Sequence, residues 1–108
     1  MEWISLDTAA QIDNIKQQQG YSLIFKHSTR CSISSMAKSR LDRSEPPQNI
    51  IFYYLDLIAH RDISNRIAEE FGVHHESPQI MLIRNGKCVY DESHNGISMD
   101  DIAQQAMK

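Results

Sequence analysis

The sequence contains few cysteines and no long apolar run. Cys31 and Cys88 are its two cysteines among 108 residues, and they stand 57 positions apart. No apolar stretch approaches the roughly 20 residues of a membrane-spanning helix, and the first residues lack the basic and apolar regions of a signal peptide. We therefore expect a cytoplasmic protein without a membrane partner, in which thiols stay reduced. Two distant cysteines then indicate chemistry or simple packing rather than a structural disulfide.

The sequence also lacks an excess of basic charge and any sign of several domains. Eleven Lys and Arg residues stand against fourteen Asp and Glu residues, which gives a formal net charge of −3 at pH 7. Without a local basic cluster, nucleic acid is not an expected partner. There are no repeats, low-complexity tracts or linkers. A chain of this length with 41% hydrophobic residues is typical of one soluble domain, which we expect to span residues 1–108.

Apolar residues at helical spacing predict four helices. Asp7 is a candidate N-cap for the first helix and Ser98 for the last, while Gly20 and Gly72 follow the expected ends of the first and third. The four predicted helices cover about residues 6–19, 32–41, 63–71 and 98–107. Each is amphipathic and long enough to cover one face of a sheet.

Four short apolar runs between these helices predict strands, at residues 21–25, 50–57, 79–83 and 87–90. Residues 50–57 are apolar at almost every position, which is typical of a central strand covered on both faces. Asn85-Gly86 is a strong hairpin signal, and the two prolines in residues 43–48 predict a loop. The order of the elements predicts an α/β fold, with a four-stranded mixed sheet and helices on both faces.

The segment Lys26–Ser34, KHSTRCSIS, places Cys31 between a predicted strand and a predicted helix. The thiolate is the nucleophile, and a helix N-terminus lowers the pKa of a thiol because it favours an anion. Arg30 and Lys26 would add positive potential, and Ser34 can donate hydrogen bonds to the sulfur from the first helical turn. The alternative is an inert, buried cysteine. The polar neighbours of Cys31 favour the reactive thiol.

Position 34 holds serine, so this corner cannot close an internal disulfide. Reduction must then proceed through a mixed disulfide with an external thiol. We expect Cys88 to be a packing residue rather than a resolving thiol. His27 could carry protons near neutral pH, although a surface position at the edge of the site is the simpler expectation. The adjacent His74 and His75 lack a third spaced ligand, so no metal site is predicted.

Several motifs together make the sequence similar to the thioredoxin fold along nearly all of its length. They are the strand before CSIS, the Ser77-Pro78 pair, the hairpin PQIMLIRNGKCVY and the Gly96-Ile97-Ser98 start of the last helix. Within that superfamily, FKHSTRCSIS resembles the monothiol bacilliredoxins of the bacillithiol system. Two positions depart from the relatives. Ser32 stands where the family usually has proline, and Phe25 stands where thioredoxins carry a buried acid.

The resemblance implies a monothiol thiol-disulfide oxidoreductase that removes bacillithiol from protein mixed disulfides. Cys31 would be the nucleophile and Ser34 its supporting group. No bound cofactor is implied, and bacillithiol would be a co-substrate. The implied partners are bacillithiolated proteins, a low-molecular-weight thiol and a second redoxin for recycling. Two alternatives stay open: a non-enzymatic module that senses oxidation or binds a partner through Cys31, and a dithiol reductase that pairs Cys31 with Cys88.

The resemblance also indicates which residues meet the substrate. It implies a cis bond before Pro78 and a Ser77 backbone that pairs with a disulfide-linked substrate. The last helix could receive an anionic group of the small thiol, although Asp100 and Asp101 would repel it and ordinary capping is the alternative. The residues expected to contact substrate are Lys26, Thr29, Arg30, Ser77, Pro78, Asn95 and Gly96.

Overall fold

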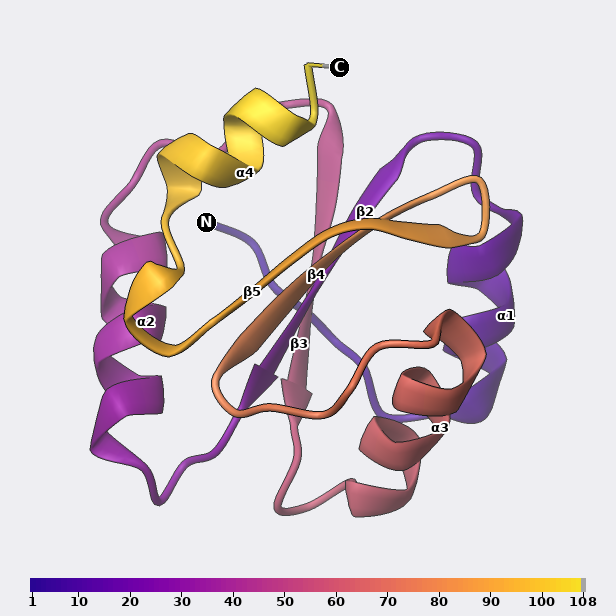
Figure 1. Cartoon of the computed structure of the whole chain (residues 1–108), viewed down its shortest axis with the longest axis horizontal. Helices are drawn as coiled ribbons and strands as arrows, with labels where there is room; N and C mark the ends of the chain where they lie inside the picture. Colours follow the sequence, from indigo (N-terminus) through magenta and orange to yellow (C-terminus); the bar gives the residue numbers. More distant parts are fainter. Residues whose placement is uncertain (108) are drawn as a thin grey trace.

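Five strands form one mixed sheet in the computed structural model, which describes residues 1–107. They are β1 (Ile4–Ser5), β2 (Tyr21–His27), β3 (Ile50–Asp56), β4 (Gln79–Arg84) and β5 (Lys87–Ser93). Their order in the sheet is β1-β3-β2-β4-β5, so β2 is the central strand. It pairs in parallel with β3 and antiparallel with β4, as Figure 1 shows.

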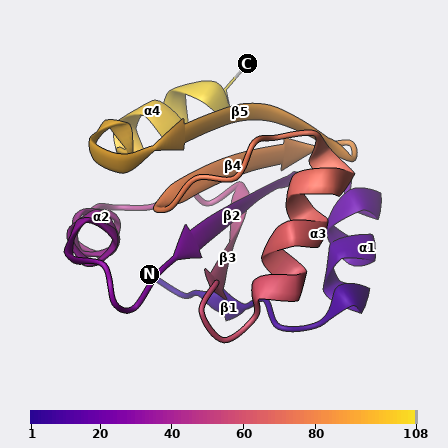
Figure 2. The same ribbon diagram turned by 60° about the horizontal axis from the view of Figure 1, so that its bottom comes forward.

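The helices lie in pairs on the two faces of this sheet (Figure 2). They are α1 (Ala9–Gln17), α2 (Ser32–Asp42), α3 (Arg61–Phe71) and α4 (Met99–Gln105), with a short 3₁₀ turn at His94–Gly96. The buried residues of α2 and α4 form one core with the sheet, and those of α1 and α3 form a second core on the opposite face. No helix within residues 1–107 has the length and apolarity required to cross a membrane.

Strand β2 separates the two cores and leads to Cys31. All seven of its residues are buried. Because side chains alternate along a strand, Leu23 and Phe25 face α2 and α4, while Ile24 faces α1 and α3. The loop after β2 then leads directly into α2. The central strand thus fixes where the Cys31 corner lies.

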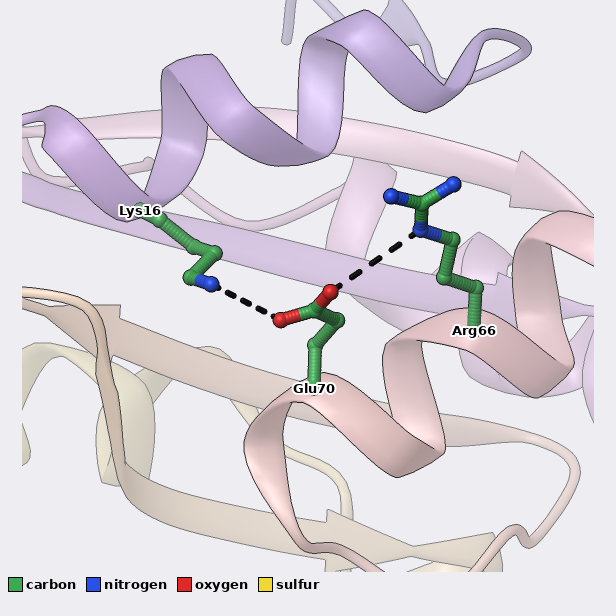
Figure 3. A network of polar contacts seen from close by, with 3 residues as sticks. All are labelled: Lys16, Arg66 and Glu70. Carbon is green, nitrogen blue, oxygen red and sulfur yellow. Dashed lines mark hydrogen bonds and ion pairs between the residues drawn. The ribbon is translucent and has the colours of Figure 1, made fainter.

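A surface network joins α1 to α3 (Figure 3). Lys16 Nζ lies 2.8 Å from Glu70 Oε2, and Arg66 Nε lies 3.9 Å from Glu70 Oε1. Exposed ion pairs of this kind contribute about 0–1 kcal/mol to stability. Burial of the isoleucines on the inner faces of both helices therefore contributes more to holding α1 and α3 in place.

The predicted order of helices and strands is confirmed, with one strand more than expected. Strand β1 has two exposed residues and therefore no apolar pattern that could reveal it. Helix α1 starts after Thr8 rather than Asp7, because Gln11 lies three residues after Thr8 and forms a capping box with it. The Gln11 side chain accepts hydrogen bonds from the backbone N–H groups of Asp7 and Thr8. Gly72 closes α3 with φ 64°, as expected. Ser98 accepts a hydrogen bond from the Asp101 N–H and caps α4.

The hairpin between β4 and β5 turns at Asn85 and Gly86, which have φ values of 54° and 76°. Both values lie in the left-handed region that a type I′ turn requires. A Cβ at Gly86 would also lie 3.2 Å from the backbone oxygen of Lys16. Glycine is therefore favoured at Gly86 by the backbone conformation and by the close approach of α1.

Candidate thiol site

Cys31 is the N-cap residue of α2 and is partly exposed. Its backbone is extended, with φ −110° and ψ 122°. The Cys31 N–H donates to the Ser28 carbonyl at 3.1 Å, which closes the turn after β2. The Ser35 N–H donates to the Cys31 carbonyl at 3.1 Å, which starts the helix. These two bonds fix the thiol at the helix N-terminus, as the sequence predicts.

Hydrogen bonds lower the pKa of Cys31. The Ser34 backbone N–H has the largest effect, and the Ile33 N–H and Ser34 hydroxyl add to it against the raising effect of desolvation. These N–H groups have no partner within the helix, so a thiolate satisfies them. The expected charge effects of Arg30 and Lys26 are not among the causes. The pKa of Cys31 is thus lowered mainly by backbone N–H donors, and not by the cationic side chains that the sequence suggested.

Ser34 is fully buried beside the thiol. The Ser28 N–H lies 3.4 Å from Ser34 Oγ and donates to it. That bond uses a lone pair of the oxygen and leaves the hydroxyl proton free to point at sulfur. The prediction that Ser34 supports the thiolate agrees with this geometry. The contribution of Ile33 was missed, because a backbone donor leaves no signature in the sequence.

Lys26 does not lie beside Cys31, which corrects the expectation that it contacts substrate. It is 0% exposed and points to the α1 and α3 face, because side chains alternate along β2. Its Nζ donates to the Ser64 carbonyl at 3.2 Å and lies 3.2 Å from His75 Nδ1. The other hydrophobic residues of β2 are buried on both faces of the sheet, so composition alone does not show which face receives the lysine.

His27 is buried rather than at the surface, which also corrects the sequence expectation. Its ring packs between Phe25 and Tyr54, with centroid distances of 5.5 and 5.4 Å. Within residues 1–107 its Nδ1 atom has no hydrogen-bond partner. Burial lowers the pKa of His27, and the Lys38 charge lowers it further. The ring is therefore neutral near pH 7 and adds no positive charge near the thiol.

The Ser77-Pro78 peptide bond is cis, as the resemblance implies. It directly precedes β4, whose Gln79 stands opposite Lys26 near the end of β2. Ser77 and Pro78 therefore lie beyond the sheet at the same end as Cys31. Thr29 and Arg30 are exposed in the turn before Cys31. The structure gathers these four predicted residues at one end of the sheet.

Asn95 and Gly96 lie farther from the thiol. Arg40 donates to the Ile97 carbonyl at 3.2 Å and to the His94 carbonyl at 3.4 Å, which ties this segment to α2. Arg40 is nine residues beyond Cys31, or about 13 Å along a helix. The carboxylate of Glu92 also lies within 2.8 Å of where a Cβ of Gly96 would stand. This negative charge weighs against an anionic group at Gly96, as Asp100 and Asp101 do.

Cys88 lies at the opposite end of the sheet from Cys31. It pairs with Ile83 of β4, which pairs with Ser22 near the start of β2. From Ser22 to His27 the strand extends about 17 Å at roughly 3.3 Å per residue. A disulfide requires Cα atoms within about 7 Å. The structure therefore excludes a Cys31–Cys88 disulfide.

The environment of Cys88 confirms that it is a packing residue. It contacts the α1 and α3 core, and its Sγ donates to the Tyr90 carbonyl at 3.4 Å. Burial raises the pKa of Cys88 to about 11. The thiol is thus protonated near neutral pH and is a poor nucleophile.

The loop that contains His74 and His75 holds no metal cluster. Across residues 1–107, no three side chains of His, Cys, Asp or Glu gather in a way that could hold an ion. His75 Nδ1 instead faces the ammonium group of Lys26. A cation at this nitrogen would meet that positive charge directly.

Ser32→Pro should stabilise the protein and leave the thiol reactive. Ser32 is the first residue of α2, where proline is favoured. The extended backbone of Cys31 suits a residue before proline, and the thiol accepts bonds from Ile33 and Ser34 rather than from the Ser32 N–H. We expect a gain of about 0.4–1 kcal/mol, because proline restricts the unfolded chain. Urea denaturation measures this gain, and the ultraviolet absorbance of the thiolate against pH tests the pKa.

Ser32→Ala is the matched control, because it removes the hydroxyl and keeps the N–H group. It should not reproduce the gain in stability. A clear rise in the Cys31 pKa in the proline variant alone would contradict the argument, since it would mean that the Ser32 N–H contributes to the thiolate.

Comparison with known proteins agrees with the fold and the thiol corner. The family described as monothiol bacilliredoxin BrxC matches residues 4–102. A solved thioredoxin-fold protein, to which an oxidoreductase activity has been ascribed, is 31% identical. That similarity covers 97% of this chain and 93% of the other, with a TM-score of 0.84.

Thioredoxins share the fold at much lower identity. Those of Malassezia sympodialis and Trypanosoma brucei brucei are each 11% identical, with TM-scores of 0.75. Each similarity covers 98% of this chain, with 89% and 88% of the other chain. The chain therefore belongs to the monothiol bacilliredoxin BrxC family and is a thiol-disulfide oxidoreductase with the thioredoxin fold.

Proposed function

We propose that this protein removes bacillithiol from protein mixed disulfides through a monothiol exchange at Cys31. The observation that carries the proposal is the thiol at the N-cap of α2. Hydrogen bonds from Ile33 and Ser34 lower its pKa, and the second cysteine lies at the far end of the sheet. Membership of the bacilliredoxin family supports bacillithiol as the small thiol.

The proposed reaction has two thiol–disulfide exchanges. In the first, the Cys31 thiolate attacks the bacillithiol sulfur of the mixed disulfide. The bond between that sulfur and the protein sulfur breaks, and the protein leaves as a thiolate that takes a proton from solvent. In the second, an external thiolate attacks the bacillithiol sulfur on Cys31. This step releases the Cys31 thiolate, and the external thiol supplies the two electrons.

Bacillithiol itself, or a second redoxin, supplies that external thiol in our proposal. No cofactor takes part in either step. We place the reaction in the cytoplasm, where a reduced thiol pool is maintained. A protein substrate would lie in extended form along the Ser77 backbone, which continues from β4 toward the Cys31 end of the sheet. Thr29 and Arg30 are exposed where they could contact it.

The first experiment compares small thiols. The protein is treated separately with the disulfides of bacillithiol, glutathione and coenzyme A, and its intact mass is then measured. We expect one adduct per chain, on Cys31, with the fastest formation from bacillithiol. Faster formation from glutathione would instead support a general glutaredoxin-like activity.

Turnover then separates an enzyme from a redox-sensing module. With excess reduced bacillithiol, the protein is mixed with a bacillithiolated protein and the released protein thiol is measured. We expect many equivalents of thiol for each molecule of enzyme. Release that stops at one equivalent would show that Cys31 is only a modifiable switch.

A further inference from the structure

Lys26 is a buried cation that the proposed exchange does not use. It is 0% exposed, and its ammonium group lies between α3 and the loop that joins α3 to β4. The Ser64 carbonyl of α3 accepts from Nζ at 3.2 Å, and His75 Nδ1 lies at 3.2 Å. Within residues 1–107 no carboxylate forms an ion pair with this lysine.

A lysine in this position is costly for the fold. Burial in the absence of an opposite charge disfavours the charged form, and it lowers the pKa of Lys26 from 10.5 to about 8. An apolar side chain of similar length would fill the same space without that desolvation. The lysine therefore contributes something that an apolar chain lacks, namely two directed hydrogen-bond donors.

The contact with Lys26 fixes the state and the orientation of His75. An ammonium group can only donate, so Nδ1 of His75 must accept and its proton must be on Nε2. The Ser64 hydroxyl also lies 3.4 Å from Nδ1. Burial, the Lys26 charge and the Arg61 charge lower the pKa of His75, in that order. The imidazole is thus held neutral, with one edge against the buried cation.

The same loop is held a second time by Gln79, which stands opposite Lys26 in the sheet. Gln79 is 0% exposed. Its Nε2 donates to the His74 carbonyl at 2.9 Å, and its Oε1 accepts from the Glu76 N–H at 3.4 Å. Both buried side chains therefore bind the segment from His74 to Glu76, which leads directly to Ser77.

We propose that Lys26 is a positioning residue for the mixed-disulfide substrate. Through His75 it sets the place of residues 74–77, and so the place of the Ser77 backbone at the Cys31 end of the sheet. This inference rests on the proposed function, because that function assigns the Ser77 backbone to the protein substrate. Lys26 acts on substrate affinity and leaves the reactivity of the thiol unchanged, since its ammonium group is buried against α3 and His75, on the face of the sheet opposite α2.

The test uses Lys26→Met, which keeps the length of the side chain and removes the donors. We expect the KM for a bacillithiolated protein to rise about tenfold, while kcat and the rate of Cys31 alkylation by iodoacetamide change less than about twofold. The melting temperature should stay the same or rise, because a buried cation is removed. Amide hydrogen exchange should become faster in residues 74–77. Lys87→Met, at an exposed lysine of β5, is the control and should change none of these.

A double-mutant cycle with His75→Leu tests whether Lys26 acts through His75. If it does, the double variant should have about the same KM as either single variant rather than the product of the two effects. An unchanged KM or unchanged loop exchange in Lys26→Met would overturn the proposal. So would a fall in melting temperature with slower alkylation, because that pattern indicates a structural role.

Failure of the Lys26 proposal can be distinguished from failure of the proposed function. If the wild-type protein does not turn over bacillithiolated proteins, the proposed function fails. The kinetic comparison then uses a protein–glutathione mixed disulfide, and loop exchange is measured in the free protein as before. Faster exchange in residues 74–77 with weaker binding of that disulfide supports positioning by Lys26, and the absence of either change overturns it.

Discussion

Cys31→Ser is expected to abolish the release of protein thiol from a mixed disulfide, with a loss of about a thousandfold or more. A serine hydroxyl is protonated near neutral pH and is a weak nucleophile without an adjacent base. The neighbouring His27 does not serve as such a base, because its ring packs against Phe25 and Tyr54 and forms no hydrogen bond to residue 31 within residues 1–107. The hydrogen bonds from α2 that stabilise a thiolate at Cys31 would not ionise a hydroxyl.

The measurement is the initial rate of thiol release from a bacillithiolated protein, in the presence of excess bacillithiol. Cys88→Ala is the matched control and should keep the wild-type rate within about twofold, because Cys88 is protonated and distant. Equal losses in the two variants would contradict the monothiol scheme.

The pH dependence of alkylation gives a second readout of the same site. The pKa of Cys31 is lowered, so its thiolate persists to a lower pH than that of an ordinary thiol. We expect the alkylation rate of wild-type protein to fall as the pH drops through this lowered pKa. In Cys31→Ser the remaining thiol is Cys88, with a pKa of about 11, so alkylation should begin only in strongly alkaline solution.

Ser34→Cys is expected to convert the monothiol site into a dithiol site. Ser34 is fully buried one helical turn from Cys31, and its hydroxyl is among the groups that lower the pKa of the Cys31 thiol. A thiol in its place lies within reach of a disulfide on Cys31. It would attack the Cys31 sulfur, form an internal disulfide and release the small thiol without an external reductant. The lifetime of the small-thiol adduct should fall by more than about a hundredfold, because the attack is intramolecular.

Intact mass spectrometry checks this outcome. After treatment with a small-thiol disulfide and removal of the excess, the wild-type protein should keep the adduct. The variant should lose it and retain only the loss of two hydrogens. Ser34→Ala is the control. It should keep the adduct as the wild type does, and its Cys31 pKa should be higher, because the hydroxyl donor is gone. A stable adduct in Ser34→Cys would show that position 34 cannot resolve it.

Much of the fold could be predicted because local pattern and tertiary structure agree. The isoleucines of α3 repeat at helical spacing and are buried as that spacing implies. Asn85 and Gly86 adopt the left-handed angles that their hairpin signal requires. Strand β1 could not be predicted, because its two exposed residues carry no apolar pattern and are placed by long-range pairing with Tyr53 and Tyr54 of β3.

The sequence predicted the site residues whose role follows from their residue type. It misplaced the residues whose position depends on which face of a strand the side chain occupies. Cys31 and Ser34 occupy the first turn of a helix whose pattern is clear in the sequence. Lys26 and His27 are the last two residues of a strand that is buried on both faces, so hydrophobic alternation gives no direction for either side chain. Only the packed structure shows that Lys26 points to α3 and that His27 packs beside Tyr54.

The buried serine beside the thiol also decides what peroxide does to this protein. Peroxide converts a thiolate to a sulfenic acid, which a neighbouring thiol can trap as a disulfide before further oxidation to the irreversible sulfinic acid. Ser34 cannot trap it, and Cys88 is at the far end of the sheet. Survival of the oxidised protein therefore depends on the concentration of small thiols around it. When that pool is depleted, Cys31 is lost to overoxidation first, and the half-buried Cys88 stays reduced because its thiol is protonated.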